Sequence, residues 1–219
     1  MSYLTVFPST NYGGMKITGD AAQSVPEASV DQAIYGGATG AVSNFTFTAG
    51  ATVDITAYAD GGGGKVTCTT AGHTFVNGDY ISITNTTNYN GVFLVSGVDG
   101  ATFQITDTFN GDDEQGTARR GDRLVAAAGA GGTYIMGFSI SASEGGAAGS
   151  TVEYSGYINA TQQGQALCRR KYANNDVGNC GATGTLTLAV GDHVWFAMQS
   201  SGTNAITIEK ANVVIHRIE

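Results

Sequence analysis

The residues with the clearest chemical potential lie beside the chain's only tryptophan, in AVGDHVWFAMQS (residues 189–200), where Asp192 precedes His193. An acid next to a histidine is a pairing that acid–base catalysis uses. The residues that follow, however, alternate between apolar and mixed positions with the two-residue period of a half-buried strand. A second Gly-Asp pair opens a strand in VNGDYISIT (residues 76–84). Because glycine and aspartate favour turns, both pairs are predicted to be hairpin corners.

Other motifs that could carry catalysis are incomplete. The run GGGGK (residues 61–65) resembles part of a phosphate-binding loop, but Val66 stands where such a loop needs Ser or Thr, and a strand pattern follows it. Nucleophilic hydrolysis would need a strained serine or a cysteine near a histidine. No Gly-x-Ser-x-Gly is present, and His73, His193 and His216 lie in three different contexts. We expect no catalytic residue, no cofactor site and no enzymatic activity.

The candidate metal and adhesion motifs have simpler readings. Asp112, Asp113 and Glu114 lack the alternating ligand positions of a calcium loop, so a solvated acidic turn is expected. Three cysteines at wide spacing are too few for a zinc ribbon. Arg120-Gly121-Asp122 spells a cell-adhesion tripeptide, but it also fits a turn that leads into a strand. We therefore expect no metal site.

Two of the cysteines, Cys168 and Cys180, flank the polar segment RRKYANNDVGN. A disulfide between them would restrict this loop by about 3 kcal/mol on the chain-entropy model. Oxidation of this kind would be permitted in a particle released from its host. The alternative is a set of free, partly buried thiols, which we favour at this point.

Composition indicates an all-β protein. The 219 residues include 33 glycines but only 2 prolines, and 13% are charged. Strand-forming and turn-forming residues are abundant while helix formers are scarce. The net charge of −8 argues against a nucleic-acid partner. No apolar run reaches the about 20 residues of a membrane helix, and the N-terminus has no secretory pattern, so synthesis in a host cytoplasm and no membrane partner are expected.

The pattern along the chain divides it into three parts. Residues 1–35 are irregular and predict an N-terminal arm that is ordered by what it docks on. Strand-like alternation fills 36–62 and 119–219. Residues 63–118 contain short, evenly spaced strands separated by turn signals, which predict a small antiparallel barrel or sandwich inserted in the larger domain. Two basic clusters, Arg119–Arg123 and Arg169–Lys171, read as solvated loops or salt bridges between subunits, with docking on an acidic protein surface as the alternative.

The C-terminal part resembles the jelly roll of the tumour necrosis factor and complement globular-head family. The resemblance rests on GGTYIMGFSISA, on the hairpin LTLAVGDHV (residues 186–194) and on the closing strand NVVIHRIE, and it covers residues 120–219 together with the strands at 41–60. It implies a jelly-roll β-sandwich and a homotrimer, because domains of that family pack three to an axis. Candidate trimer-interface residues are then Tyr134, Met136, Phe138, Trp195 and Phe196.

The middle part resembles a small β module of tailed-bacteriophage virion proteins. The shared features are AGHTFVNGDYISITNTTNYNGVFLVSGV, then ATFQIT and GDDEQG. The resemblance implies a viral structural protein: a capsid decoration or head-fibre protein on the capsid exterior that binds the major capsid protein through its arm. The candidate anchoring residues are Tyr3, Leu4, Val6, Phe7, Met15 and Ile17. The alternative is a tail-associated receptor-binding tip for a cell-surface or mucus glycan, with ligand loops at Asn88, Tyr89, Arg169, Arg170 and Tyr172.

Overall fold

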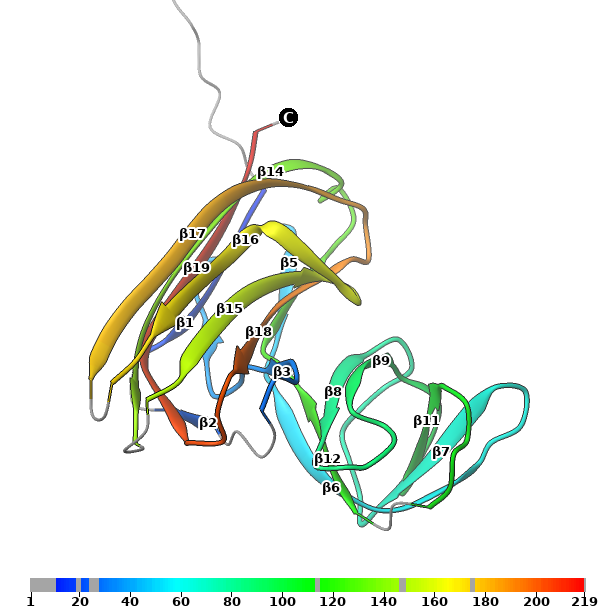
Figure 1. Ribbon diagram of the computed structural model, residues 1–219. Helices are drawn as coiled ribbons and strands as arrows, with labels where there is room; N and C mark the ends of the chain where they lie inside the picture. Colours follow the sequence, from blue (N-terminus) through cyan, green and yellow to red (C-terminus); the bar gives the residue numbers. More distant parts are fainter. Residues whose placement is uncertain are drawn as a thin grey trace, which may run out of the picture.

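The computed structural model describes residues 11–18, 21–23, 28–112, 115–145, 149–173 and 176–218. These residues form three antiparallel β-sheets, and none of them forms a helix that could cross a membrane. Figure 1 shows two sheets packed face to face and a third curled into a smaller unit at one end. The predicted all-β class is confirmed.

The two facing sheets, which we name sheet A and sheet B, each have six strands. Sheet A has the order β17 (Val177–Leu188), β14 (Gly132–Glu144), β19 (Ile206–Arg217), β1 (Tyr12–Ile17), β4 (Ala38–Thr39), and β2 (Ala21–Gln23) also pairs with β19. Sheet B has the order β16 (Thr161–Lys171), β15 (Thr151–Ile158), β18 (His193–Ser200), β13 (Arg123–Ala126), β5 (Phe45–Thr48), and β3 (Gln32–Ala33) also pairs with β18.

The chain changes sheet at nearly every connection after β13. It passes to sheet A at β14, to sheet B for the β15–β16 hairpin, back to sheet A at β17, to sheet B at β18 and to sheet A at β19. Consecutive strands that alternate between two facing sheets make a jelly roll. The predicted jelly-roll sandwich is therefore confirmed by the strand order itself.

The third sheet is a seven-stranded barrel with its own core. Its order is β10 (Ser96–Asp99), β11 (Thr102–Thr106), β7 (Lys65–Thr70), β6 (Ala51–Asp60), β12 (Gly116–Arg120), β8 (Tyr80–Thr84), β9 (Gly91–Leu94). The edge strands β9 and β10 are consecutive in the chain through Val95, which curls the sheet almost closed. The largest apolar side chains of this core are Ile55, Tyr58, Phe75, Ile81, Ile83, Tyr89, Phe103 and Ile105.

The domain boundaries differ from those that the sequence suggested. The barrel extends over residues 51–120 and not over 63–118, because residues 51–55 of β6 pair with residues 116–120 of β12. The glycine run Gly61–Gly64 is the turn between β6 and β7 and not a boundary. Three of its residues, Gly62, Gly63 and Gly64, have positive φ, a backbone conformation that glycine adopts without strain. The barrel thus interrupts the hairpin formed by β5 and β13.

The expected N-terminal arm over residues 1–35 is also wrong in part. Tyr12–Ile17 forms β1 and pairs with β19 over six residues. Met15 and Ile17, on either side of the exposed Lys16, lie in the jelly-roll core. Residues 1–10 lie outside the described part of the chain. The misjudged segment contains two glycines, which masked its strand pattern.

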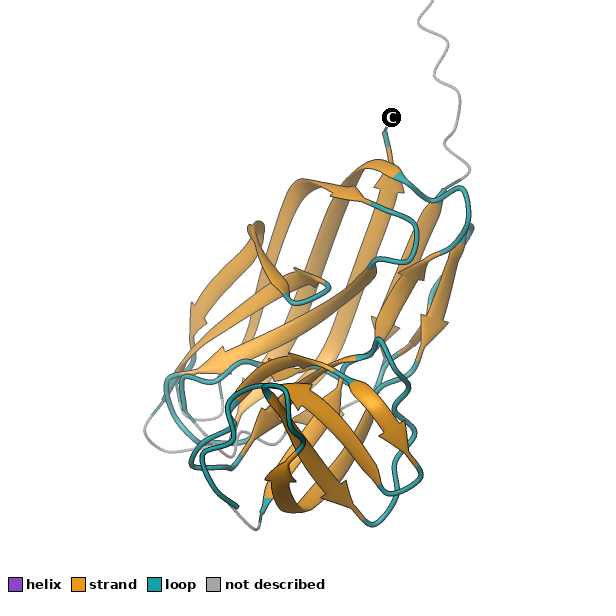
Figure 2. Ribbon diagram, turned by 90° about the vertical axis from the view of Figure 1, so that its right-hand side faces the viewer, coloured by secondary structure: helices purple, strands orange, loops and turns teal. Residues whose placement is uncertain are grey.

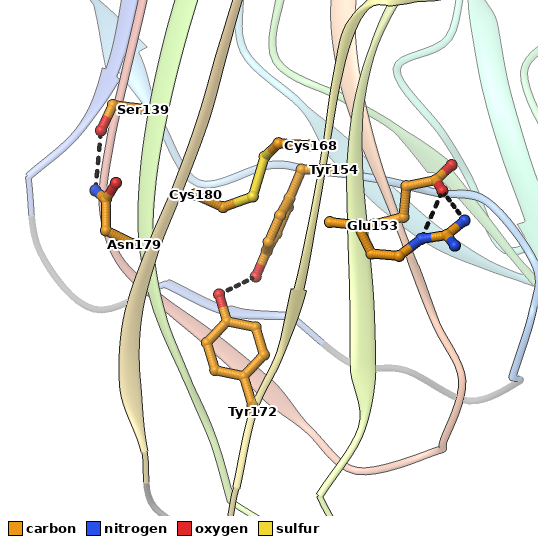
Figure 3. The surroundings of a disulfide bond; sticks show 8 residues. Ser139, Glu153, Tyr154, Cys168, Tyr172, Asn179 and Cys180 are labelled. Atoms are coloured by element: carbon orange, nitrogen blue, oxygen red, sulfur yellow. Dashed lines mark hydrogen bonds and ion pairs between the residues drawn. A yellow bond between two sulfur atoms is a disulfide. The ribbon is translucent and has the colours of Figure 1, made fainter.

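A disulfide joins Cys168 of β16 to Cys180 of β17, with the two Cα atoms 6.1 Å apart. These strands are edge strands of opposite sheets, so the bond connects sheet B to sheet A along one side of the sandwich. Figure 3 shows it next to the buried Tyr154 and Tyr172, whose hydroxyls lie 3.0 Å apart. The preference for free thiols at these two positions is thus wrong, since the fold brings together cysteines that the sequence only placed around a loop.

We predict that Cys168→Ala/Cys180→Ala lowers the free energy of unfolding by about 3 kcal/mol, because it removes a cross-link that restricts the unfolded chain. Urea denaturation of both proteins, with and without a reductant, measures the effect. The reductant should shift the wild-type midpoint and leave that of the double variant unchanged. A wild-type midpoint that does not respond to reductant would contradict the prediction.

The third cysteine, Cys68, is buried, which raises its pKa to about 12 and slows its reaction with alkylating agents.

Candidate functional site

The junction between the jelly roll and the barrel holds the densest group of buried charges in the described structure. The chain crosses it twice, from β5 to β6 and from β12 to β13. Asp79, fully buried in a barrel turn, pairs with Arg120 at 2.7 Å and with Arg123 at 2.6 Å. Arg120 also donates to the carbonyl oxygens of Thr74 and Ala49. One carboxylate therefore ties a barrel loop to both ends of the second crossing.

The charge state of Asp79 follows from these contacts. Burial alone would raise the pKa of its carboxyl group. The hydrogen bond from Arg120, the charge of Arg123 and the amide of Val76 act in the opposite direction, and together they hold the pKa below its ordinary value. Asp79 is therefore ionised at neutral pH and matched by two cations.

Asp122 fixes the second crossing from the other side. Its carboxylate accepts hydrogen bonds from the amides of Gly37, at 2.5 Å, and Gly50, at 2.7 Å. Burial raises the pKa of this carboxyl group, and the two amide donors partly oppose that effect. A side chain at Gly50 would meet Tyr35 Cβ at 2.6 Å, so the first crossing also runs in close contact. Arg120-Gly121-Asp122 is thus part of the junction, where Arg120 and Asp122 are buried.

The barrel also covers part of the outer face of sheet B. Trp195 and Tyr157 stack with ring centroids 4.5 Å apart, and with Ala33 and Ala197 they form a buried cluster against which Tyr80 and Val92 of the barrel pack. Ser82 of the barrel accepts a hydrogen bond from the amide of Ala33. Both faces of β18 are therefore buried, whereas its alternation predicted burial of one face.

The two Gly-Asp corners differ in role. Asp192 closes the β17–β18 turn by accepting from the amide of Ala189 at 2.8 Å, as its sequence predicted. His193 contacts the ring of Tyr80 edge-on, 5.5 Å between centroids. Burial, followed by the charge of Arg123, lowers the pKa of the His193 imidazole.

Asp79 likewise closes a turn, but the sequence did not predict its ion pairs. No local signal connects Asp79 to arginines 41 and 44 residues further along the chain.

The five candidate trimer-interface residues lie inside the single subunit. Tyr134, Met136, Phe138 and Phe196 belong to the jelly-roll core, and Trp195 belongs to the cluster under the barrel. Their placement at a subunit interface is wrong, because all five are already covered within one chain, the most exposed being Phe138 at 6%. The five side chains thus mark faces buried within the subunit, four against the opposite sheet and Trp195 under the barrel.

The candidate ligand loops are likewise divided by the structure. Tyr89 and Tyr172 are fully buried and so are not available to stack on a sugar, which corrects their assignment. Tyr89 donates to the carbonyl of Gly111 and stacks on Tyr58 inside the barrel. Asn88 is exposed on the barrel, whereas Arg169 and Arg170 lie on the jelly roll. The structure therefore does not bring these five residues together.

The two arginines of this set are occupied by carboxylates. Arg169 pairs with Glu153 at 2.5 Å, and Arg170 pairs with Asp176 at 3.0 Å. The guanidinium of Arg170 also lies 5.4 Å from the ring centre of Tyr172. The sequence suggested solvated loops or salt bridges between subunits for this cluster, whereas these two arginines lie on β16 and form their ion pairs within one chain.

The anchoring candidates divide in the same way. Tyr3, Leu4, Val6 and Phe7 lie outside the described residues. Met15 and Ile17 are buried at 5% and 7% exposure, which corrects their assignment as docking residues.

The candidate metal ligands are only partly described. Asp112 accepts a hydrogen bond from the amide of Tyr58, and Asp113 and Glu114 lie outside the described residues. Among the described residues, no three acidic, cysteine or histidine side chains gather in a way that could hold a metal ion.

Two features remain as candidate sites. A small cavity of about 30 Å³ lies between the two sheets and is lined mainly by apolar side chains such as Met15 and Phe196. The outer face of sheet A is uncovered. Tyr12, Ile135 and Val214 point outward from it with exposed fractions of 37%, 42% and 47%. They belong to neighbouring strands, since Tyr12 and Ile135 both pair with His216.

Comparisons with known proteins provide little evidence on the fold beyond the strand order. No protein-family model and no curated protein matches the chain. A solved structure described as "Structure of Eiger TNF from S. frugiperda" is similar to it, with 11% sequence identity and a TM-score of 0.36. The match covers 45% of this chain and 65% of that chain, less than two thirds of its length. The likeness is too weak to support a functional argument, and the jelly-roll assignment rests on the sheet topology described above.

We predict that Asp79→Asn destabilises the protein by about 3–5 kcal/mol at pH 7, since it leaves two buried guanidinium groups without their carboxylate. Asp54→Asn, on an exposed position of β6, is the matched control and should have little effect. Because the folded pKa of Asp79 is lowered, its contribution is present above about pH 4 and is lost as the pH falls through the folded value. Urea denaturation at a series of pH values measures this. A difference from wild type that persists unchanged into strong acid would contradict the ionic explanation.

Proposed function

We propose that this chain is a non-enzymatic structural protein of a tailed-bacteriophage virion, a trimeric capsid decoration or head-fibre protein. The single observation that carries the proposal is the polarity of the subunit. Figure 2 shows the C-terminus at one end of the jelly roll and the barrel at the other end. The backbone amide of Arg217, two residues before that terminus, donates to the carbonyl oxygen of Asn11. The resemblance of the barrel sequence to a phage virion module supports the same assignment.

This polarity suits a protein that is held at one end and presents the other. Residues 1–10 directly precede Asn11 in the chain, and Asn11 is hydrogen-bonded to Arg217 close to the C-terminus. They include Tyr3, Leu4, Val6 and Phe7, which we propose bind the major capsid protein. The barrel then faces away from the shell. The net charge of −8 is compatible with a place on the capsid exterior, where the protein would stabilise the shell or give weak adhesion.

The outer face of sheet A is our proposed contact between three copies. It carries Tyr12, Ile135 and Val214 as exposed apolar side chains, whereas the barrel covers part of the outer face of sheet B. Burial of these side chains against identical copies would stabilise a trimer. Three N-terminal segments held together would then bind a local three-fold site of the shell with avidity, because the second and third bind at high effective concentration.

The alternative placement is a receptor-binding tip on the tail that recognises a cell-surface glycan. The two placements differ in copy number and position. Cryo-electron microscopy of virions separates them, since decoration proteins occupy many sites on the shell and tail tips only a few.

We predict that deleting residues 1–10 reduces co-sedimentation of the purified protein with capsids by about tenfold or more, since avidity is lost with the anchors. The deletion stops before β1, so the jelly-roll core is kept and the melting temperature should change little. Asn88→Ala, on the exposed barrel loop, is the control and should bind capsids as wild type does. Capsid binding that survives the deletion would contradict the anchoring role.

A second prediction concerns assembly. Ile135→Glu/Val214→Glu should convert a particle with the mass of three chains into single chains, because it places six carboxylates in the proposed trimer contact. Native mass spectrometry measures the change. Val190→Glu is the matched control, since Val190 is exposed to 59% in the β17–β18 turn, away from sheet A's outer face. A wild-type monomer, or a trimer that tolerates the double variant, would disprove this contact.

A further inference from the structure

The outer face of sheet A also holds an open groove of about 600 Å³, formed by β1, β14, β17 and β19. A volume of this size fits a ligand of a few sugar rings. Its polar lining consists of Lys16, Lys210, Ser139, Ser141, Asn179 and Asn212, with Thr18 at one end. Of the described residues that line it, none is acidic.

The register of the strands arranges these side chains in two adjacent rows. Lys16 pairs with Asn212, which pairs with Ser139 on its other side. In the next row Lys210 pairs with Ser141, which pairs with Asn179. Lys16 and Lys210 are thus diagonal neighbours across β1 and β19, with Cβ atoms about 7–8 Å apart. Each ammonium group lies next to a row of hydroxyl and amide groups.

A local irregularity of the sheet lies at the same place. The pairing of β14 with β19 slips between Ser141 and Ala142, where β19 has one extra residue, Glu209. A bulge bends its strand and increases the local twist, and bulges are frequent next to binding sites, where they redirect side chains. Lys210 directly follows the extra residue.

The polar side chains of the groove are partly fixed before any ligand binds. Asn179 donates from Nδ2 to Ser139 Oγ at 3.0 Å, as Figure 3 shows, which sets the orientation of both groups. Its carbonyl oxygen faces away from that bond and remains an acceptor. The two ammonium groups have no carboxylate within ion-pair distance among the described residues, where all four ion pairs are made by arginines.

We infer that this groove binds an acidic saccharide, a sugar chain carrying carboxylate or sulfate groups. Two lysines attract the anionic groups, and serine and asparagine side chains, which both donate and accept, match sugar hydroxyls. A nucleic acid is disfavoured because the chain carries a net charge of −8. An acidic peptide is also disfavoured. It would need pockets for its side chains, and the apolar residues that line the groove are Ile17 and Ala211. The inference stands whether or not the protein binds capsids.

The test is calorimetric titration of the full-length protein with three probes: tetragalacturonate, its complete methyl ester, and a sulfated tetrasaccharide of similar length. Lys16→Gln/Lys210→Gln should weaken binding of the acidic probes by about tenfold or more, because it removes both cations and keeps most of each side chain. Lys65→Gln/Lys171→Gln is the matched control, since it makes the same change of net charge elsewhere and should bind within about twofold of wild type. Comparison of the two acidic probes tells carboxylate from sulfate recognition.

A second variant separates a saccharide site from a simple anion site. Ser141→Ala keeps both charges and should weaken tetragalacturonate by about threefold or more, while the methyl ester should bind the wild type at least about tenfold more weakly than the acid does. Equal binding of acid and ester, or no effect of the lysine variant, would overturn the inference. Hexaglutamate is titrated in addition as a peptide control, and binding of hexaglutamate as tight as that of tetragalacturonate would also overturn the inference, in favour of an acidic protein partner.

Discussion

The arrangement of the two domains depends on one buried carboxylate that is shared by two arginines. Asp79 comes from a barrel turn, while Arg120 ends the last barrel strand and Arg123 begins the next strand of the jelly roll. Two separate cores joined by two chain crossings would otherwise be free to hinge. Removing the carboxylate would leave two guanidinium groups buried without an ion-pair partner, so these ion pairs hold the junction in one arrangement. Asp122 strengthens it by binding the amides of Gly37 and Gly50.

The rigid junction decides which surfaces are available for function. The barrel covers part of the outer face of sheet B, where Trp195 and Tyr157 are buried. The outer face of sheet A remains open. One part of it carries Tyr12, Ile135 and Val214, and a neighbouring part forms the groove with Lys16 and Lys210. The apolar part suits contact between copies, and the basic polar part suits a charged ligand. The Cys168–Cys180 disulfide stiffens the same sandwich by joining its two sheets along one side.

Together these features describe a stiff subunit with distinct ends. The C-terminus lies at one end of the jelly roll, and the barrel lies at the opposite end. At the junction the buried charges of Asp79, Arg120 and Arg123 are paired with one another, whereas Lys16 and Lys210 lie on the open face of sheet A.

Local sequence determined the strands and their turns. Two-residue periodicity fixed the inward face of β14, and Gly-Asp corners marked hairpins, because both depend on neighbours within a few residues. The sequence also indicated an inserted β module. Only the tertiary structure decided what covers each face. Trp195 and Phe196 are both buried because two different partners pack on β18. The arginines near residue 120 are interior because Asp79 reaches them from a distant turn, and the cysteines bond because two sheet edges meet. Contacts of this kind join residues far apart in the chain, and no local pattern encodes them.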